Sequence, residues 1–154
     1  GIRVPYIVRN PKKITPGSIS DQVGYFADFF PTILELIGLK SDETFDGNSI
    51  AGVLHGTKKS TDVPPLYWEF YEKDGWRATR FGKWKAIQNN LHQSHQGPIE
   101  LYDLYRDPGE TFDISQSHPQ LVEKAKKIFK TASVPSEHYF WKFQQRGATD
   151  IYNN

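Results

Sequence analysis

The stretch Gly97-Pro-Ile-Glu-Leu-Tyr-Asp-Leu-Tyr-Arg-Asp-Pro-Gly-Glu-Thr-Phe-Asp-Ile114 joins an alternating segment, a turn and a return to apolar sequence. Ile99, Leu101 and one side of the segment 102–104 alternate with polar residues, which is typical of a half-buried strand. Asp107-Pro108-Gly109 then favours a turn, because proline presets φ and glycine accepts positive φ. The stretch therefore predicts the last strand of a small sheet, followed by a tight turn.

Three more strands are expected ahead of this one. Short turn segments, Lys73-Asp-Gly75 and Gly82, separate runs that are rich in aromatic and β-branched residues. A helix should follow, because Pro119 suits the first helical position and apolar residues then recur at helical spacing. Its other face carries the charged residues Glu123, Lys124, Lys126, Lys127 and Lys130, which we interpret as a solvated face. The expected strands are Leu66–Glu72, Trp76–Phe81, Lys83–Asn89 and Glu100–Leu104, in a four-stranded antiparallel meander crossed on one face by the helix.

The first 62 residues predict a different organisation. Residues 2–8 have the composition of a strand, and prolines and a glycine end it by residue 17. Asp28 is placed to cap a helix that ends at Gly38. That helix is apolar around most of its circumference, so we expect it to be mostly buried. A short helix at Asn48–Leu54 precedes a polar connector, where we place a boundary.

Composition limits the function classes. The 19 Lys and Arg residues nearly balance the 18 Asp and Glu residues, so nothing favours nucleic acid or anionic lipid as a partner. The longest apolar stretches are too short for a membrane span. The chain has no cysteine, which removes disulfides and cysteine nucleophiles and leaves the compartment open. It opens without Met or a basic leader, so we expect a piece of a longer polypeptide.

Two histidines lie where a ligand could be met. The segment between the third and fourth strands, Asn90–Pro98, is polar and too long for a tight hairpin, which favours a functional loop. It contains His92 and His95, which could donate hydrogen bonds to a polar substrate. No histidine pair has the helical spacing of a zinc site, and no metal ligands are expected in this chain.

The chain resembles the C-terminal portion of the sulfatase family over most of residues 1–133. The resemblance implies an α/β fold, present here as an α+β fragment. Residues 1–62 would end the large α/β domain, residues 63–133 would form a sheet-plus-helix subdomain, and residues 134–154 a tail. The motifs that carry it, in the order that sulfatases show, are Gly1-Ile-Arg-Val-Pro5, Asp28-Phe-Phe-Pro-Thr-Ile-Leu-Glu-Leu-Ile-Gly38, Phe45-Asp-Gly-Asn-Ser49, Arg80-Phe-Gly-Lys-Trp-Lys85 and the stretch 97–114.

The resemblance implies hydrolysis of aryl or carbohydrate sulfate esters by the full-length parent. Sulfatases use a formylglycine made from Cys or Ser in a Cys/Ser-x-Pro-Ser/Ala-Arg motif, together with a calcium ion. Ser133-Val-Pro-Ser-Glu137 resembles this motif but has glutamate in place of arginine and follows a helix, so we interpret it as a helix exit. We expect no catalytic residue here. Formylglycine and calcium are expected in the parent, and the chain alone should be inactive.

The resemblance also implies partners. The chain would pack against the N-terminal sulfatase domain and shape a pocket for a sulfated small molecule or glycan, with His92 and His95 in a loop directed toward it. An exported or lysosomal compartment is favoured. An unpaired strand at residues 2–8 would invite self-association. Two alternatives stay open: a phosphonate- or phosphate-monoester hydrolase of the same superfamily, and a non-enzymatic module that binds sulfated glycans or another partner.

Overall fold

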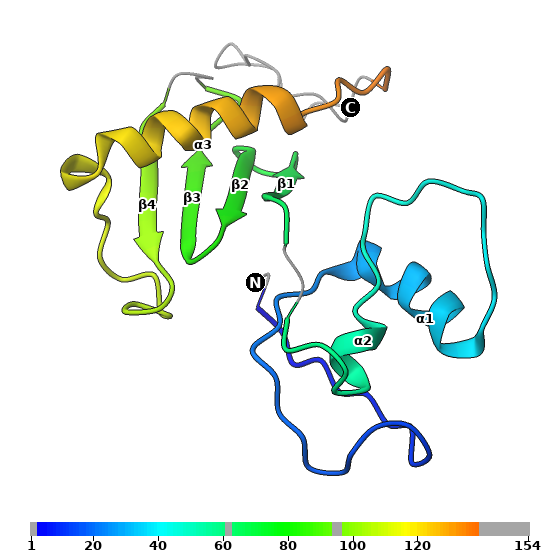
Figure 1. Cartoon of the computed structure of the whole chain (residues 1–154). Coiled ribbons are helices and arrows are strands. Elements are labelled where there is room, and N and C mark those ends of the chain that lie inside the picture. Colours follow the sequence, from blue (N-terminus) through cyan, green and yellow to red (C-terminus); the bar gives the residue numbers. More distant parts are fainter. Residues whose placement is uncertain (1–2, 61–62, 94–96, 139–154) are drawn as a thin grey trace. The chain divides into compact units, whose positions relative to one another are not determined.

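A computed structural model of the chain describes residues 3–60, 63–93 and 97–138. The chain folds as two compact units, an N-terminal unit, Gly1–Val63, and a C-terminal unit, Pro64–Asn154 (Figure 1). Within the described ranges, no helix has the length and apolar character needed to cross a membrane.

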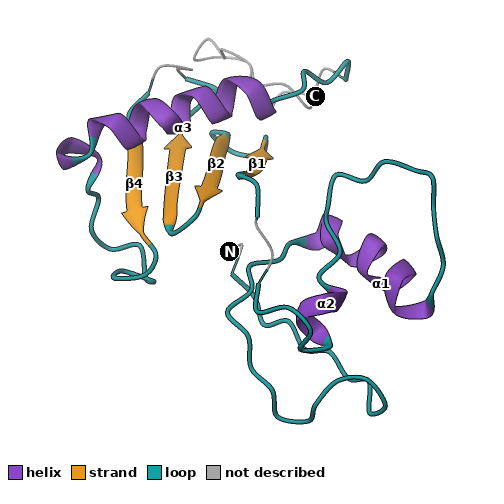
Figure 2. Ribbon diagram, in the orientation of Figure 1, coloured by secondary structure: helices purple, strands orange, loops and turns teal. Residues whose placement is uncertain are grey.

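The C-terminal unit contains the predicted four-stranded antiparallel sheet (Figure 2). Each strand pairs with the next along the chain, and Thr79, Ala86 and Leu101 stand opposite one another across the three later strands. The meander is therefore confirmed, with ends that differ from the prediction by up to two residues. The strands are β1, Leu66–Phe70; β2, Trp76–Phe81; β3, Trp84–Asn89; and β4, Ile99–Asp103.

Helix α3, Pro119–Ala132, lies across one face of this sheet, as predicted (Figure 1). A short 3-10 turn, η2, Ser115–Ser117, precedes it. The helix buries Ala125 and Phe129 completely against the strands. Burying an aromatic side chain of this size typically contributes about 3 kcal/mol. The core of the unit consists of Phe81, Ala86, Ile99, Leu101, Ala125 and Phe129.

The N-terminal unit holds little regular structure: η1, Phe26–Asp28; α1, Phe29–Ile37; and α2, Ala51–Leu54. Gly38 has φ of 75° and ends α1 as predicted. Asp28 stands at the N-cap position of α1 but does not cap it. Its buried carboxylate accepts hydrogen bonds from the backbone N–H of Tyr25 (3.0 Å) and of Asn48 (2.8 Å) instead.

Two predictions for this unit were wrong. The strand expected at residues 2–8 does not form over the part that the structure describes, since residues 3–10 have no regular secondary structure. A strand is stabilised by pairing, and the described residues supply none to this segment. Helix α1 is not mostly buried, because Thr32 is its one buried residue and the side chains of Phe30 and Ile37 are 57% and 62% exposed. Its apolar pattern has no matching partner surface in the described unit.

Candidate functional site

The loop after β3 is fastened to the turn between β1 and β2. Asn90 has φ of 59°, which reverses the chain as it leaves the strand. The N–H of Leu91 then donates to the carbonyl of Gly75 (3.1 Å), and the N–H of His92 donates to the carbonyl of Asp74 (3.0 Å). Leu91 is almost completely buried. The first residues of the loop therefore have a fixed position on the sheet.

His92, a predicted substrate ligand, lies at this fixed base. Its side chain is buried, and Nε2 lies 2.7 Å from the carbonyl oxygen of Tyr71. A carbonyl only accepts, so this ring nitrogen carries the hydrogen. The other end of the loop is also held, because Nε2 of Gln88 donates to the carbonyl of Gly97 (2.7 Å). His95 lies outside the described residues, and substrate contact by either histidine stays a prediction.

A second polar cluster forms around Glu69 of the edge strand β1, next to the C-terminal end of α3. The carboxylate accepts hydrogen bonds from the hydroxyls of Tyr67 and Tyr71 and from Oγ of Ser133, the last at 2.7 Å. Burial, and after it the hydrogen bond to Glu69, raises the pKa of both tyrosines. These phenols therefore stay protonated and act as donors to Glu69, while the bond from Ser133 ties the same carboxylate to the end of the helix.

Ser133 opens the segment that resembles the formylglycine motif. It stands at the C-cap position of α3 with extended backbone angles, and its hydroxyl is occupied by Glu69. This position agrees with the interpretation as a helix exit. A nucleophile needs an open approach and a base of its own, whereas the carboxylate beside Ser133 is shared with two tyrosines.

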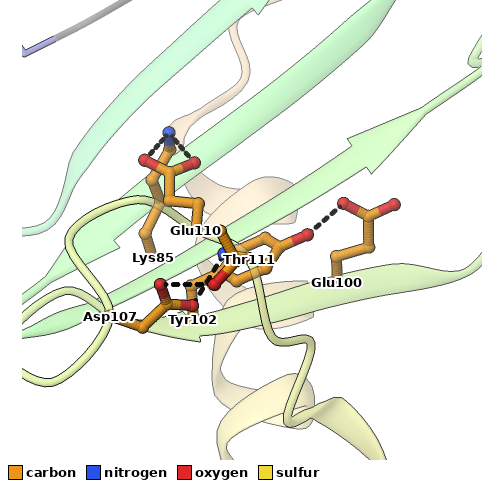
Figure 3. A network of polar contacts seen from close by, with 6 residues as sticks. All are labelled: Lys85, Glu100, Tyr102, Asp107, Glu110 and Thr111. Carbon is orange, nitrogen blue, oxygen red and sulfur yellow. Dashed lines mark hydrogen bonds and ion pairs between the residues drawn. The ribbon is translucent and has the colours of Figure 1, made fainter.

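The third cluster lies on the face of the sheet opposite α3 (Figure 3). Lys85 is 10% exposed at its side chain, and its Nζ lies 2.6 and 2.5 Å from the two carboxylate oxygens of Glu110. Glu110 has φ of 56°, an uncommon conformation for glutamate. Beside this pair, the hydroxyl of Tyr102 donates to Glu100 (2.7 Å). Burial first, and then this bond, raises the pKa of Tyr102.

The turn at Asp107-Pro108-Gly109 is closed by the side chain of Asp107. Its carboxylate accepts the N–H groups of Thr111 (2.8 Å) and Phe112 (2.9 Å) and the Thr111 hydroxyl (3.0 Å). The N–H of Phe112 is the largest influence that lowers the pKa of Asp107, and burial opposes it. The turn is thereby closed on itself and held on the sheet through Glu110 and Lys85.

The carboxylates of these clusters accept hydrogen bonds from neighbouring groups, and those of Glu69 and Glu110 fasten a helix end and a turn to the sheet. Sequence reasoning missed Glu69 and the pair of Lys85 with Glu110. A signal for the pair existed, since Lys85 interrupts an apolar strand and Glu110 directly follows the turn. Across the described ranges, no three His, Cys, Asp or Glu side chains come together in a group that could hold a metal ion.

Comparison with known proteins gives the family. The family model for the C-terminal region of N-sulphoglucosamine sulphohydrolase matches residues 1–133. An ulvan-active sulfatase of Formosa agariphila is 45% identical over 84% of this chain and 32% of its own length. An uncharacterized sulfatase of Schizosaccharomyces pombe is 33% identical over 80% of this chain and 24% of its own length. The chain thus spans about a quarter to a third of the length of these relatives.

A solved structure also shares the fold. It is described as a complex with its substrate D-glucosamine-2-N,6-O-disulfate, and it superposes with a TM-score of 0.62 at 23% identity over 82% of this chain and 27% of its own. At this identity, the similarity shows the fold alone. Together with the match to the family model over residues 1–133, these likenesses show that the chain belongs to the sulfatase family and corresponds to its C-terminal portion.

Proposed function

We propose that the polypeptide carrying this chain hydrolyses sulfate esters, and that its substrate is an aryl or a carbohydrate sulfate. The observation that carries the proposal is the family match over residues 1–133, supported by 45% identity to an ulvan-active sulfatase. A carbohydrate sulfate is favoured by two similar proteins, a sulfatase described as ulvan-active and a protein solved with a glucosamine disulfate.

The chain itself would shape the substrate pocket, while the catalytic groups lie elsewhere in the polypeptide. Two observations support this division. Ser133 is bonded to Glu69 at a helix exit, and the described residues do not gather carboxylates of the kind that hold calcium. We therefore propose that the formylglycine and the calcium ligands of the parent lie outside this chain. The N-terminal sulfatase domain would be the partner of both units.

The loop after β3 is the proposed substrate contact. Its support is the fixed base, since Leu91, His92 and Gln88 hold both ends of the loop on the sheet. Such a base would let a polar side chain of the loop meet a substrate at low entropic cost. His95→Ala in the full-length protein should raise KM. His92→Ala should lower stability, because the substitution empties a buried, hydrogen-bonded position. An unchanged KM in His95→Ala would contradict this role of the loop.

The direct test is an activity assay of the chain and of the full-length polypeptide, each purified from a host without sulfatase and supplied with calcium. We expect turnover of an aryl sulfate by the full-length protein and none by the chain alone. Turnover by the chain alone would overturn the division of roles. Preference of the full-length protein for an aryl phosphonate monoester would favour the other hydrolase. Saturable binding of sulfated glycans without any turnover would favour a binding module.

Two further expectations belong to this proposal. The exposed apolar segment that includes Val4, Tyr6 and Ile7 would make the isolated chain self-associate. Sedimentation of the chain should show oligomers that Ile7→Lys reduces, and a strictly monomeric chain would contradict this. The proposed compartment is exported or lysosomal, which fractionation of the source cells can test.

A further inference from the structure

The outer face of α3 carries a net positive charge, although the chain as a whole has almost no net charge. The helix carries four lysines and one glutamate, a net charge of +3. The whole chain carries +1, so all other residues together sum to −2. Charge of one sign gathered on one face attracts an oppositely charged partner at a distance. The helix is therefore one place in this chain where an anionic partner is favoured, and it differs from the basic stretch 1–20 in being a regular element packed on a sheet.

Three of these lysines form a row. Lys124, Lys127 and Lys130 recur every third residue, which spaces them over roughly 9 Å along the helix axis. All three are exposed, whereas Ala125 and Phe129 point into the core. We call these three residues the lysine row. Because α3 is packed on the sheet, the lysine row keeps a fixed orientation relative to the sheet (Figure 2).

The lysine row is also electrostatically available. The fourth lysine, Lys126, donates to Glu123 (2.6 Å) in an exposed pair, which leaves the row without a neutralising carboxylate among the described contacts. The ammonium group of Lys124 lies 5.2 Å from the ring centroid of Phe81, a contact that positions the charge without cancelling it. The row therefore presents three positive charges in fixed order on a rigid element.

We propose that the lysine row is a secondary binding site for a sulfated polysaccharide, outside the catalytic pocket. A sulfated polymer carries permanent negative charges at regular spacing, and lysine binds such groups as a point charge. The inference rests on the proposed function, because a sulfatase acting on a polymer encounters many sulfate groups besides the one it cleaves. Binding at the row would keep the polymer on the enzyme between turnovers.

The test is binding of the full-length protein to immobilised heparin, eluted by salt. Lys124→Gln, Lys127→Gln and Lys130→Gln, combined in one variant, should weaken binding by more than about tenfold at low salt and flatten its salt dependence. The matched control combines Lys12→Gln, Lys40→Gln and Lys59→Gln. These lysines are exposed in the N-terminal unit, and their removal changes the net charge equally. The control should change binding by less than about twofold.

The outcomes separate this inference from the proposed function. Turnover of a small aryl sulfate should be unchanged in the row variant, while KM for a sulfated polysaccharide rises. Equal binding losses in the row variant and its control would overturn the inference, even if the enzyme is a sulfatase. Equal binding of the unmodified protein to heparin and to hyaluronan, which carries carboxylates but no sulfate, would also overturn it. Absence of all turnover would contradict the proposed function. The comparison of heparin binding between the row variant and its control would still decide the inference about the lysine row.

Discussion

The two units of the chain differ in where they keep their apolar side chains. The C-terminal unit buries Phe129 of α3 and Leu101 of β4 between the helix and the sheet, at 1% and 0% exposure. In the N-terminal unit, Ile19 and Phe26 are 94% and 90% exposed. The buried side chains of its first helices are polar: the carboxylate of Asp28 and the hydroxyl of Thr32. One unit thus has a large hydrophobic core of its own, whereas the described part of the other buries only Ile50 and Ala51 among its apolar side chains, beside the hydrogen-bonded Asp28 and Thr32.

This difference indicates which unit can fold independently. Hydrophobic burial is the main favourable contribution to folding, so the C-terminal unit carries its own stabilisation. The N-terminal unit exposes an apolar surface of the kind that other parts of a protein normally cover. This agrees with the proposal that the N-terminal sulfatase domain is its partner.

The largest expected effect comes from a matched pair of substitutions, one in each unit. Phe129→Ala should lower the free energy of unfolding of the C-terminal unit by about 3–5 kcal/mol, because it leaves a cavity under α3. Phe26→Ala should change stability by less than about 0.5 kcal/mol, since its ring is already in water. Urea titration followed by tryptophan fluorescence measures the first effect, because all four tryptophans follow Pro64.

Hydrogen exchange across both units measures the second effect. A loss of protection after Phe26→Ala as large as the loss after Phe129→Ala would break the contrast between the units. It would mean that the N-terminal unit also depends on a hydrophobic cluster.

The next effect tests the hydrogen-bonded junction of the N-terminal unit. A Cβ at Gly47 would lie 2.2 Å from the backbone carbonyl carbon of Ala27, so Gly47→Ala must push two backbone segments apart. We expect a destabilisation of about 1–3 kcal/mol. The amides of Asn48 and Ile50, which donate to Asp28 and Thr32, should lose protection from hydrogen exchange.

Gly52→Ala is the matched control for this junction. A Cβ at Gly52 would meet only the flexible side chain of Lys58, which can move aside. Unchanged protection in both variants would show that the junction is not what holds this unit together.

A smaller effect is expected at the ion pair on the face of the sheet opposite α3. Glu110→Gln should cost about 1–2 kcal/mol, since Lys85 keeps its charge at a mostly buried position and part of the cost is screened by solvent. Lys126→Gln breaks an exposed pair and should cost less than about 0.5 kcal/mol. A double-mutant cycle that adds Lys85→Met measures the coupling, and a coupling near zero would show that the turn does not depend on this pair.

The sequence predicted the C-terminal unit better than the N-terminal unit, and the contrast explains why. Alternation along β2 to β4 and the helical spacing of Leu121, Ala125 and Phe129 are local patterns that the fold uses directly. Residues 2–8 have the composition of a strand, and α1 is apolar around most of its circumference. Their structure, however, depends on partners that the pattern does not name. An apolar pattern predicts that a residue will be covered but does not identify the covering element.

The candidate site shows the same limit at the level of single side chains. The long loop after β3 was recognisable from its length and polarity. The burial of His92 was not, because it depends on the carbonyl of Tyr71, which lies 21 residues earlier. Glu69 was missed for a similar reason, since its partner Ser133 is 64 residues away in the sequence.

The smallest effect is a pH dependence of the turn at Asp107. The folded state lowers the pKa of this carboxyl, chiefly through the N–H of Phe112, so the charged form contributes stability above the ordinary value of 3.8. That contribution should be lost as the pH falls through 3.8 and below. Asp107→Asn should therefore lower the stability of the C-terminal unit at neutral pH and flatten its decline in acid. Because the carboxyl is exposed, the difference should be small and should shrink further in high salt. Parallel acid profiles for the variant and the unmodified chain would show that the turn is held by Glu110 and Lys85 instead, so this variant and Glu110→Gln together determine which contact fixes the turn on the sheet.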